Sequence, residues 1–330
     1  MVDLLSYNTF GIRAAALDMV HIKSETQLIE FLKANHESIF ILGGGSNILF
    51  CKDVDAHILR NEIRGIEIIE EDDQEILVKV GGGEIWHELV QWAIDHNYGG
   101  IENLSLIPGT VGAAPIQNIG AYGVELKDVF DSLTAINTTT FEKETFSKED
   151  CHFDYRDSFF KRAGKGRYFI CSVCFKLKKF PIINVQYGDI QKVLTEKNIE
   201  HPTIKDISEA VIQIRRSKLP DPKVLGNAGS FFKNPTLSAA EFSRFIERFP
   251  QAPSYPLMDG NVKVPAGWLI EQAGWKGKRV GNSGCHEKQA LVLVNYGNAT
   301  GQEIVDLALM IQKDIWEKFE VQISPEVNWI

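Results

Sequence analysis

Two glycine-rich segments of this 330-residue sequence are its first candidates for ligand binding. Residues 42–48 read LGGGSNI and follow a short apolar run; consecutive glycines after a strand let backbone N–H groups approach an anion closely. Ile48 stands where a dinucleotide-binding G-x-G-x-x-G motif has its third glycine, and no Lys-Ser/Thr pair follows as in a P-loop. The segment is therefore either another type of anion-binding loop or a tight turn between strands.

The second glycine-rich segment is residues 108–123 (PGTVGAAPIQNIGAYG), which carries almost no charge. Its many small side chains suit close packing of the backbone around a flat ligand. A buried packing loop of glycine and alanine would have the same composition, so both readings stay open on these residues alone.

Two clusters of charged residues are suited to anionic groups. In YRDS (residues 155–158) Arg156 stands beside Asp157, as in many surface ion pairs, but an arginine can also hold a carboxylate through two hydrogen bonds. Residues 215–222 (RRSKLPDP) concentrate cations in an acidic protein. This second cluster indicates either a pyrophosphate site or the solvated end of a helix.

A serine and a glutamate complete the set of reactive candidates. Ser230 lies between Gly229 and two phenylalanines, and without a G-x-S-x-G motif it is not indicated as a hydrolase nucleophile. Glu326, near the chain end, is either solvated or held in a site, since Pro325 restricts its backbone approach and its other neighbours are apolar.

Apolar spacing predicts the elements that position these residues. A helical stripe spans 84–97, and the stretch 101–125 that follows is too rich in glycine and proline for an ordinary helix or strand. The mixture of elements predicts an α+β chain. Further strands are expected at 39–42, 76–80, 133–137, 167–177, 290–295 and 320–323, and further helices at 188–198, 207–218, 238–248, 265–273 and 301–319.

Composition bounds the possible functions. Lys and Arg number 35 against 44 Asp and Glu, a net charge of -9, which argues against extended nucleic-acid binding. Five scattered cysteines fit a reducing compartment; Cys171 and Cys174 fall on opposite faces of an expected strand, which favours core packing over a redox or zinc pair. No metal site is expected from the histidine spacing. Without a secretory signal or a long apolar run, a soluble cytoplasmic protein is predicted.

In their order along the chain, these motifs resemble those of the UDP-N-acetylenolpyruvoylglucosamine reductase family over about residues 8–330. These reductases belong to a wider flavoprotein class shared with vanillyl-alcohol oxidases. The resemblance implies an α+β fold: an FAD-binding domain of the vanillyl-alcohol-oxidase type in two α/β subdomains, and a C-terminal α+β substrate domain. The expected boundaries are 1–65 (joined by a strand at 325–330), 66–218 and 219–324.

The resemblance further implies FAD as cofactor and NADPH as cosubstrate. The reaction would reduce an enolpyruvyl ether of UDP-N-acetylglucosamine to UDP-N-acetylmuramate, a step in peptidoglycan synthesis on which cell-wall formation, cell shape and cell division depend. The implied cofactor-binding residues are Gly43, Gly44, Gly45, Ser46, Asn47, Pro108, Gly109, Thr110, Ala113, Gln117, Ile119, Gly120 and Ile170.

Catalytic roles are implied in the same way for Arg156, for Ser230 as the proton donor and for Glu326. Residues 184–189 (NVQYGD) resemble an insert, found in one subgroup, whose tyrosine closes over the nucleotide. Many members have an arginine where this chain has Asn328. The implied substrate-binding residues are Tyr122, Tyr187, Lys218, Asn234 and Gln289.

Two alternatives remain at the level of sequence. A flavin oxidase of the vanillyl-alcohol class shares the FAD loops but does not need the set of Arg156, Ser230 and Glu326. A non-catalytic UDP-sugar-binding protein needs no flavin. The protein is further expected to be a monomer. It is expected to bind a UDP-sugar, and to bind neither nucleic acid nor membranes.

Overall fold

The computed structural model describes residues 1–185 and 187–330; Gln186, in the expected insert, lies outside the described residues. The chain divides into two compact units. The first unit comprises residues 1–2, 16–44 and 55–217, and the second comprises 3–15, 45–54 and 218–330. The domain boundaries expected from the sequence stay a prediction.

The first unit contains a small four-stranded sheet with the order β1-β2-β5-β3. Its strands β3 and β5 run parallel, and the strand predicted at 39–42 is confirmed. Ser24 is the N-cap residue of helix α1, because its hydroxyl accepts from Gln27 N at 3.1 Å. The bounds are β1 (Val2–Asp3), β2 (Ala15–Ile22), α1 (Glu25–Ala34), β3 (Ile39–Leu42) and β5 (Val54–Asn61).

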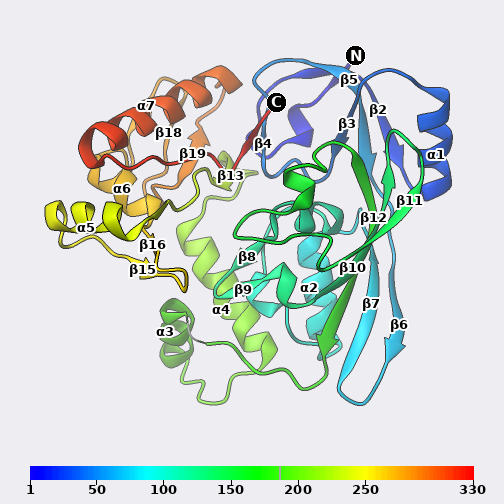
Figure 1. Cartoon of the computed structure of the whole chain (residues 1–330), viewed down its shortest axis with the longest axis horizontal. Helices are drawn as coiled ribbons and strands as arrows, with labels where there is room; N and C mark the ends of the chain where they lie inside the picture. The colour runs from blue at the N-terminus through cyan, green and yellow to red at the C-terminus, as the bar shows by residue number, and fades with distance from the viewer. Residues whose placement is uncertain (186) are drawn as a thin grey trace. The chain divides into compact units, whose positions relative to one another are not determined.

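A five-stranded antiparallel sheet forms the main layer of the first unit, with the order β11-β10-β12-β7-β6 (Figure 1). Helix α2 (Trp86–Asp95) packs on it, and the Trp86 ring meets the Phe175 ring edge-on at 5.9 Å. Cys171 and Cys174 both lie in β12, as predicted. The strands are β6 (Ile66–Glu71), β7 (Glu75–Gly81), β10 (Phe130–Asn137), β11 (Lys143–Ser147) and β12 (Tyr168–Lys178).

The glycine-rich stretch 101–125 contains only short elements and no long helix or strand, which agrees with the prediction that it is no ordinary helix or strand. It contains the 3-10 helix η3, which sequence analysis did not anticipate, and a tight β8–β9 hairpin. Tyr122 and Gly123 form the turn of this hairpin with φ of 50° and 80°, both left-handed, as a type I′ turn requires. The elements are η2 (Glu102–Leu104), η3 (Val111–Gln117), β8 (Gly120–Ala121), β9 (Val124–Glu125) and η4 (Leu126–Asp128).

Helices α3 (Gly188–Glu196) and α4 (Ile204–Lys218) follow the main sheet and agree with the predicted helices. They share one apolar cluster, to which α3 contributes Ile190 and Val193 and α4 contributes Ile207. The partly buried ring of Tyr122 packs against the same cluster. The 3-10 helix η5 (Phe159–Lys161) lies in the connection between β11 and β12.

The second unit combines small sheets with three helices. One antiparallel sheet has the order β13-β19-β18-β17, another has the order β14-β16-β15, and β4 pairs in parallel with β20. The bounds are η1 (Leu5–Tyr7), β4 (Ile48–Leu49), β13 (Gly226–Ser230), β14 (Thr236–Leu237), α5 (Ala239–Arg248), β15 (Tyr255–Pro256), β16 (Val262–Lys263), α6 (Ala266–Gln272), β17 (Arg279–Val280), β18 (Ser283–Cys285), β19 (Val292–Asn295), α7 (Gly301–Phe319) and β20 (Asn328–Trp329).

The strand predicted at 320–323 is wrong. Helix α7 ends at Phe319, the C-cap residue Glu320 has a left-handed φ of 56°, and residues 320–323, all of which the structure describes, form no strand. Val321 and Ile323 are buried, which explains the alternating pattern, but the Ile323 carbonyl accepts from the Gln312 side chain at 2.7 Å instead of from a neighbouring strand. Among the described residues, no helix is long and apolar enough to cross a membrane.

Candidate active site

The predicted site residues are divided between the two units. The first unit holds most of the predicted FAD-binding residues and Arg156, whereas the second holds Ser230 and Glu326. The residues of the first unit are Gly43, Gly44, Pro108, Gly109, Thr110, Ala113, Gln117, Ile119, Gly120, Tyr122, Arg156, Ile170 and Tyr187. Those of the second unit are Gly45, Ser46, Asn47, Lys218, Ser230, Asn234, Gln289 and Glu326.

The two glycine-rich segments touch within the first unit. A Cβ added at Gly44 would lie 2.8 Å from Gly109 Cα, and one added at Gly43 would lie 2.9 Å from Thr110 Oγ1. Real Cβ atoms do not come this close, so these glycines allow one loop to pack directly on the other. Two segments separated in sequence thus form one surface of backbone and small side chains.

Gly45 has a different constraint. Its φ is 64°, and an added Cβ would lie 1.9 Å from the Tyr7 carbonyl oxygen within the second unit. The glycine is therefore required by packing of the protein itself. Further along this loop, Asn47 donates from Nδ2 to the Glu326 carbonyl at 3.3 Å.

The backbone around η3 is packed as tightly. Gly112 N donates to the Gly82 carbonyl at 2.8 Å, and an added Cβ there would lie 3.0 Å from the Ile170 carbonyl oxygen. Asn118 follows η3 with a left-handed φ of 42° and is held by its own side chain, which donates to the Asp154 carbonyl at 3.1 Å. Non-glycine residues in this conformation are strained and cluster at functional sites.

The hydroxyl oxygen of Thr110, Oγ1, is a buried polar atom of this surface that has no hydrogen-bond partner among the described residues. A buried hydroxyl without a partner is unfavourable, so its place between the glycine loops indicates a polar ligand group there. The residues present therefore fit a cofactor bound through backbone and small side chains, as FAD would be.

Replacing Thr110 with valine is expected to weaken FAD binding about tenfold without lowering the stability of the apoprotein. Valine keeps the shape of the side chain and removes a hydroxyl whose burial without a partner costs about 1–3 kcal/mol. Flavin titration and thermal unfolding of the apoprotein measure the two effects. Thr138→Val is the control, because its hydroxyl donates to the Arg167 carbonyl at 3.2 Å on an exposed turn. An unchanged FAD affinity would contradict the assignment.

Arg156 lies in a strained backbone conformation with a φ of 54°. Its guanidinium donates from Nη2 to the Gly120 carbonyl in the predicted FAD loop. The neighbouring Asp157 pairs instead with Arg162, whose Nε lies 2.8 Å from Asp157 Oδ2. The arrangement brings Arg156 to the predicted FAD loop, whereas its role at a substrate stays a prediction.

Two arginines and an imidazole interact within the first unit, and one of the arginines, Arg215, also interacts with Tyr122. The charge of Arg215 acts on the Tyr122 phenol, and Arg215 Nε is buried without a hydrogen-bond partner among the described residues. Burial lowers the pKa of Arg215 and raises the pKa of Tyr122. His87 was not predicted from the sequence; burial, followed by the charges of Arg216 and Arg215, lowers its pKa.

His87 is also fixed by the backbone. Its Nδ1 accepts from Leu106 N at 3.0 Å, which places the proton of the neutral ring on Nε2. With both Arg215 and Arg216 nearby, this region of an acidic protein favours an anionic ligand. No spacing in the sequence pointed to His87, because its partners come from another segment.

In the second unit, the segments that carry Ser230 and Glu326 lie side by side. Glu326 N donates to the Phe231 carbonyl at 2.7 Å, and Phe232 forms a bridge with Pro325. Ser230 is exposed, whereas Phe231 and Phe232 are buried. The motif therefore buries its aromatic rings in the core and leaves the serine at the surface of the unit.

Asn328, where many relatives have an arginine, makes a local contact. Its backbone N and its Nδ2 both donate to the Asn47 carbonyl, each at 3.1 Å. The side chain thus supports the pairing of β20 with β4 beside Glu326.

Two predicted substrate-binding residues meet at the start of α6. Asn234 Oδ1 accepts from Ala266 N at 2.9 Å, and Gln289 Oε1 would lie 3.5 Å from a Cβ at Gly267. Lys218 is the last residue of α4. The structure thus brings Asn234 and Gln289 together at one helix end.

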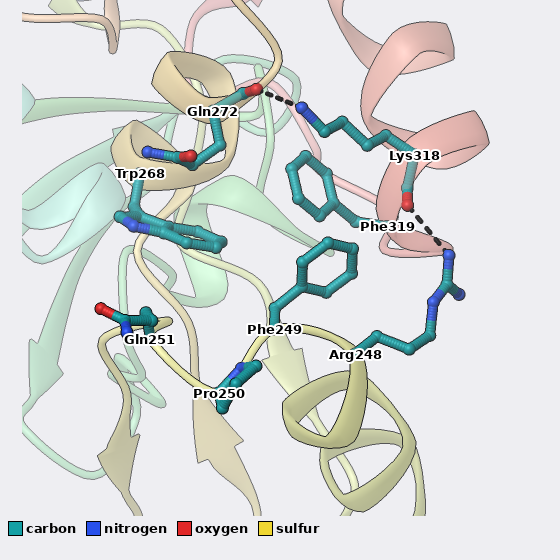
Figure 2. A pocket seen from close by; sticks show the side chains of 8 residues that line it. All are labelled: Arg248, Phe249, Pro250, Gln251, Trp268, Gln272, Lys318 and Phe319. Atoms are coloured by element: carbon teal, nitrogen blue, oxygen red, sulfur yellow. Dashed lines mark hydrogen bonds between the residues drawn. The ribbon is translucent and has the colours of Figure 1, made fainter.

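The second unit contains a pocket of about 240 Å³ (Figure 2). Its aromatic walls belong to a cluster of rings, in which the ring centroids of Phe249 and Phe319 are 4.8 Å apart. Lys318 and Arg248 at its edge already donate to backbone carbonyls. None of its lining residues is a predicted site residue; they are Arg248, Phe249, Pro250, Gln251, Trp268, Gln272, Lys318 and Phe319.

The fold and the glycine-loop surface define an FAD-binding flavoprotein. Residues 19–140 match the family described as "FAD binding domain", and residues 221–330 match "UDP-N-acetylenolpyruvoylglucosamine reductase, C-terminal domain". The chain is 54% identical over 330 residues to the UDP-N-acetylenolpyruvoylglucosamine reductase of Flavobacterium johnsoniae, covering 99% of this chain and 98% of the relative. It is 48% identical over 328 residues to that of Burkholderia lata, covering 98% and 94%. The chain belongs to the UDP-N-acetylenolpyruvoylglucosamine reductase family.

A solved structure supports the fold. The UDP-N-acetylenolpyruvylglucosamine reductase of Thermus caldophilus is similar with a TM-score of 0.67 and 23% identity, covering 99% of this chain and 97% of that one. The predictions of the family, of the α+β fold with an FAD-binding domain and of an FAD-dependent oxidoreductase are confirmed. The subgroup with the tyrosine insert and the individual site residues stay predictions.

Proposed function

We propose that this chain uses NADPH and FAD to reduce UDP-N-acetyl-3-O-(1-carboxyvinyl)glucosamine to UDP-N-acetylmuramate, a peptidoglycan precursor. The observation that carries the proposal is similarity along the whole chain to relatives named for this reductase. The contact between the segments of Ser230 and Glu326 supports it, because both are needed by the chemistry that follows.

When bound, FAD supplies the hydride that the CH2 end of the vinyl ether accepts. Negative charge then develops on the substrate around its carboxylate. Arg156 is proposed to stabilise this charge by charge-assisted hydrogen bonds. Glu326 is proposed to be protonated beside the carboxylate, so that it donates a hydrogen bond instead of repelling the substrate.

Ser230 is proposed to give its proton to the carbon that carries the carboxylate. Its exposure on the second unit supports this role, since a buried hydroxyl could not reach a substrate. After proton transfer the serine oxygen carries negative charge, which Lys218 or backbone N–H groups are proposed to stabilise.

An NADPH oxidation assay tests the proposed function. The purified yellow protein is expected to oxidise NADPH only when the enolpyruvyl ether is added, with UDP-N-acetylmuramate as the product. NADPH oxidation that does not depend on this substrate, or oxidation of an alcohol at the expense of oxygen, would contradict it. A colourless protein that binds UDP-sugars would contradict it as well.

Tyr187→Ala is expected to raise KM for the UDP-substrate about tenfold and KM for NADPH much less. Tyr187 is 48% exposed and its ring centroid lies 5.2 Å from that of Tyr122, which supports the proposal that it covers a bound nucleotide. Steady-state kinetics with each substrate varied in turn measures both constants. The exposed Tyr255 provides a control for the loss of a surface ring. Equal increases in both constants would contradict the assignment.

The protein is further proposed to act as a cytoplasmic monomer. Its five cysteines are free in the structure, which fits a reducing compartment. Size-exclusion chromatography with light scattering tests the oligomeric state.

A further inference from the structure

Asn103 connects two segments that both carry predicted substrate-binding residues. It lies in η2, and its side chain is 1% exposed. Its Nδ2 donates to the Tyr122 carbonyl at 3.0 Å and to the Asn184 carbonyl at 3.2 Å. Tyr122 belongs to the β8–β9 turn, whereas Asn184 lies three residues before Tyr187. One amide group thus ties the turn of Tyr122 to the segment of Tyr187.

The chemistry of these contacts fixes the orientation of the amide. Both partners are carbonyl oxygens, so only the NH2 group can serve both of them. The Asn103 Oδ1 atom is buried and has no partner among the described residues. A buried acceptor without a partner is unfavourable, so Oδ1 does not favour an asparagine at this position. The two hydrogen bonds that Nδ2 donates are therefore the interactions that an asparagine provides here.

The local fold around Asn103 is held by other groups. The Trp86 indole donates to the Leu104 carbonyl at 3.0 Å, and the Ser105 hydroxyl lies 2.8 Å from that of Ser208. Glu102 Oε2 accepts from Gly100 N at 2.6 Å. Within the described part of the chain, the hydrogen bonds of the Asn103 side chain go to the two distant segments, so η2 itself does not depend on them.

The two connected segments meet again through their side chains. The Tyr122 and Tyr187 rings pack edge-to-face with centroids 5.2 Å apart and an interplanar angle of 80°. Asn184 Nδ2 also lies 3.4 Å from the Gly123 carbonyl. Beyond Tyr187 the segment continues into α3, which packs on α4 (Figure 1). Along the chain, Tyr187 therefore lies between Asn184, which Asn103 contacts, and helix α3, which packs in the apolar cluster with α4.

We propose that Asn103 is a positioning residue that holds the Tyr187 segment against the Tyr122 turn, so that binding of the UDP-substrate depends on its amide. The inference rests on the proposed role of Tyr187 at the nucleotide. Tyr122 adopts a strained left-handed backbone, and the bond from Asn103 to its carbonyl helps to hold this conformation. Asn103 acts through these two tyrosines and touches no substrate itself.

Asn103→Asp is the sharpest test, because aspartate has almost the same shape and lacks the two donors. Its carboxylate oxygens would face two carbonyl oxygens. The expected result is an increase in KM for the UDP-substrate of about tenfold, the effect of losing a buried hydrogen-bond donor, with KM for NADPH and kcat little changed. Asn103→Ser, which keeps one donor, is expected to give a smaller increase in the same constant.

A double-mutant cycle with Tyr187→Ala separates positioning from general destabilisation. If Asn103 acts through Tyr187, Asn103→Asp in the Tyr187→Ala background should add much less than tenfold, because the partner is already absent. Asn137→Asp is the matched control: Asn137 is 5% exposed in the same unit, and its Nδ2 donates to Glu144 at 3.2 Å on the β10–β11 hairpin. This control is expected to lower the unfolding temperature and leave both KM values unchanged.

The possible outcomes distinguish the proposed role of Asn103 from the proposed role of Tyr187 on which it rests. Full additivity in the cycle, or an unchanged KM in folded Asn103→Asp and Asn103→Ser, would overturn the role of Asn103 alone. A Tyr187→Ala variant with normal KM for the UDP-substrate would overturn the proposed role of Tyr187 and the inference with it. Equal changes in both KM values would show that Asn103 only stabilises the fold.

Discussion

Ser230→Ala is expected to slow oxidation of the bound cofactor by the enolpyruvyl substrate about 1000-fold, within the range for loss of a general acid. Reduction of FAD by NADPH should stay near normal, because it needs no proton at the substrate carbon. Stopped-flow measurement of the flavin absorbance follows each half-reaction separately. The expected result is thus a large effect on one half-reaction and almost none on the other.

The structure indicates that Ser230→Ala removes the hydroxyl without disturbing the packing around it. Ser230 is exposed, whereas Phe231 and Phe232 next to it are 0% and 1% exposed, so alanine removes a surface hydroxyl and leaves the core intact. Ser324→Ala is the matched control, since Ser324 is also exposed and contacts the same motif through its backbone carbonyl, which accepts from Lys233 N at 2.9 Å. The control should leave both half-reactions unchanged.

Ser230→Cys is expected to recover part of the lost rate, because a thiol is a stronger acid than a hydroxyl and has a similar shape. Equal slowing of both half-reactions in Ser230→Ala would show that the serine positions the cofactor. If neither half-reaction changed, the proton donor would have to be another group.

The sequence predicted much of the fold because its signals are local. The apolar stripe before Gly99 predicted α2, and the apolar run before Gly43 predicted β3. The 3-10 helix η3 could not be found in this way, since Gly112 and Pro115 disfavour a helix, and its place is set by packing against Gly82. The error at 320–323 has the same origin, because burial there occurs without strand pairing.

The candidate site could also be predicted only as far as its signals are local in the sequence. Ser230 and Glu326 stand in motifs that can be read as short strings of residues, and only the structure shows that their segments are hydrogen-bonded neighbours. His87 and Asn103 were missed because each gains its role from distant residues. The Asn184 carbonyl that Asn103 contacts is 81 residues away, and no pattern near Asn103 indicates it.

Arg156→Lys is expected to slow the half-reaction with the enolpyruvyl substrate about 100-fold, the lower part of the range for losing a donor that stabilises charge in the transition state. Lysine keeps the positive charge but loses the planar fork that holds a carboxylate through two hydrogen bonds. The substitution also removes the guanidinium that contacts the Gly120 carbonyl. FAD reduction by NADPH should change much less.

A nearby arginine provides the control for this substitution. Arg162 lies six residues on, is 58% exposed and pairs with Asp157 at 2.8 Å. Since exposed ion pairs contribute little, Arg162→Lys is expected to leave both half-reactions and the FAD content unchanged. If Arg156→Lys lowered the FAD content and slowed both half-reactions alike, its contact with the Gly120 loop would explain the loss, and the role at the substrate carboxylate would be wrong. Selective slowing of the substrate half-reaction, with normal FAD content, requires instead that the guanidinium acts on the substrate.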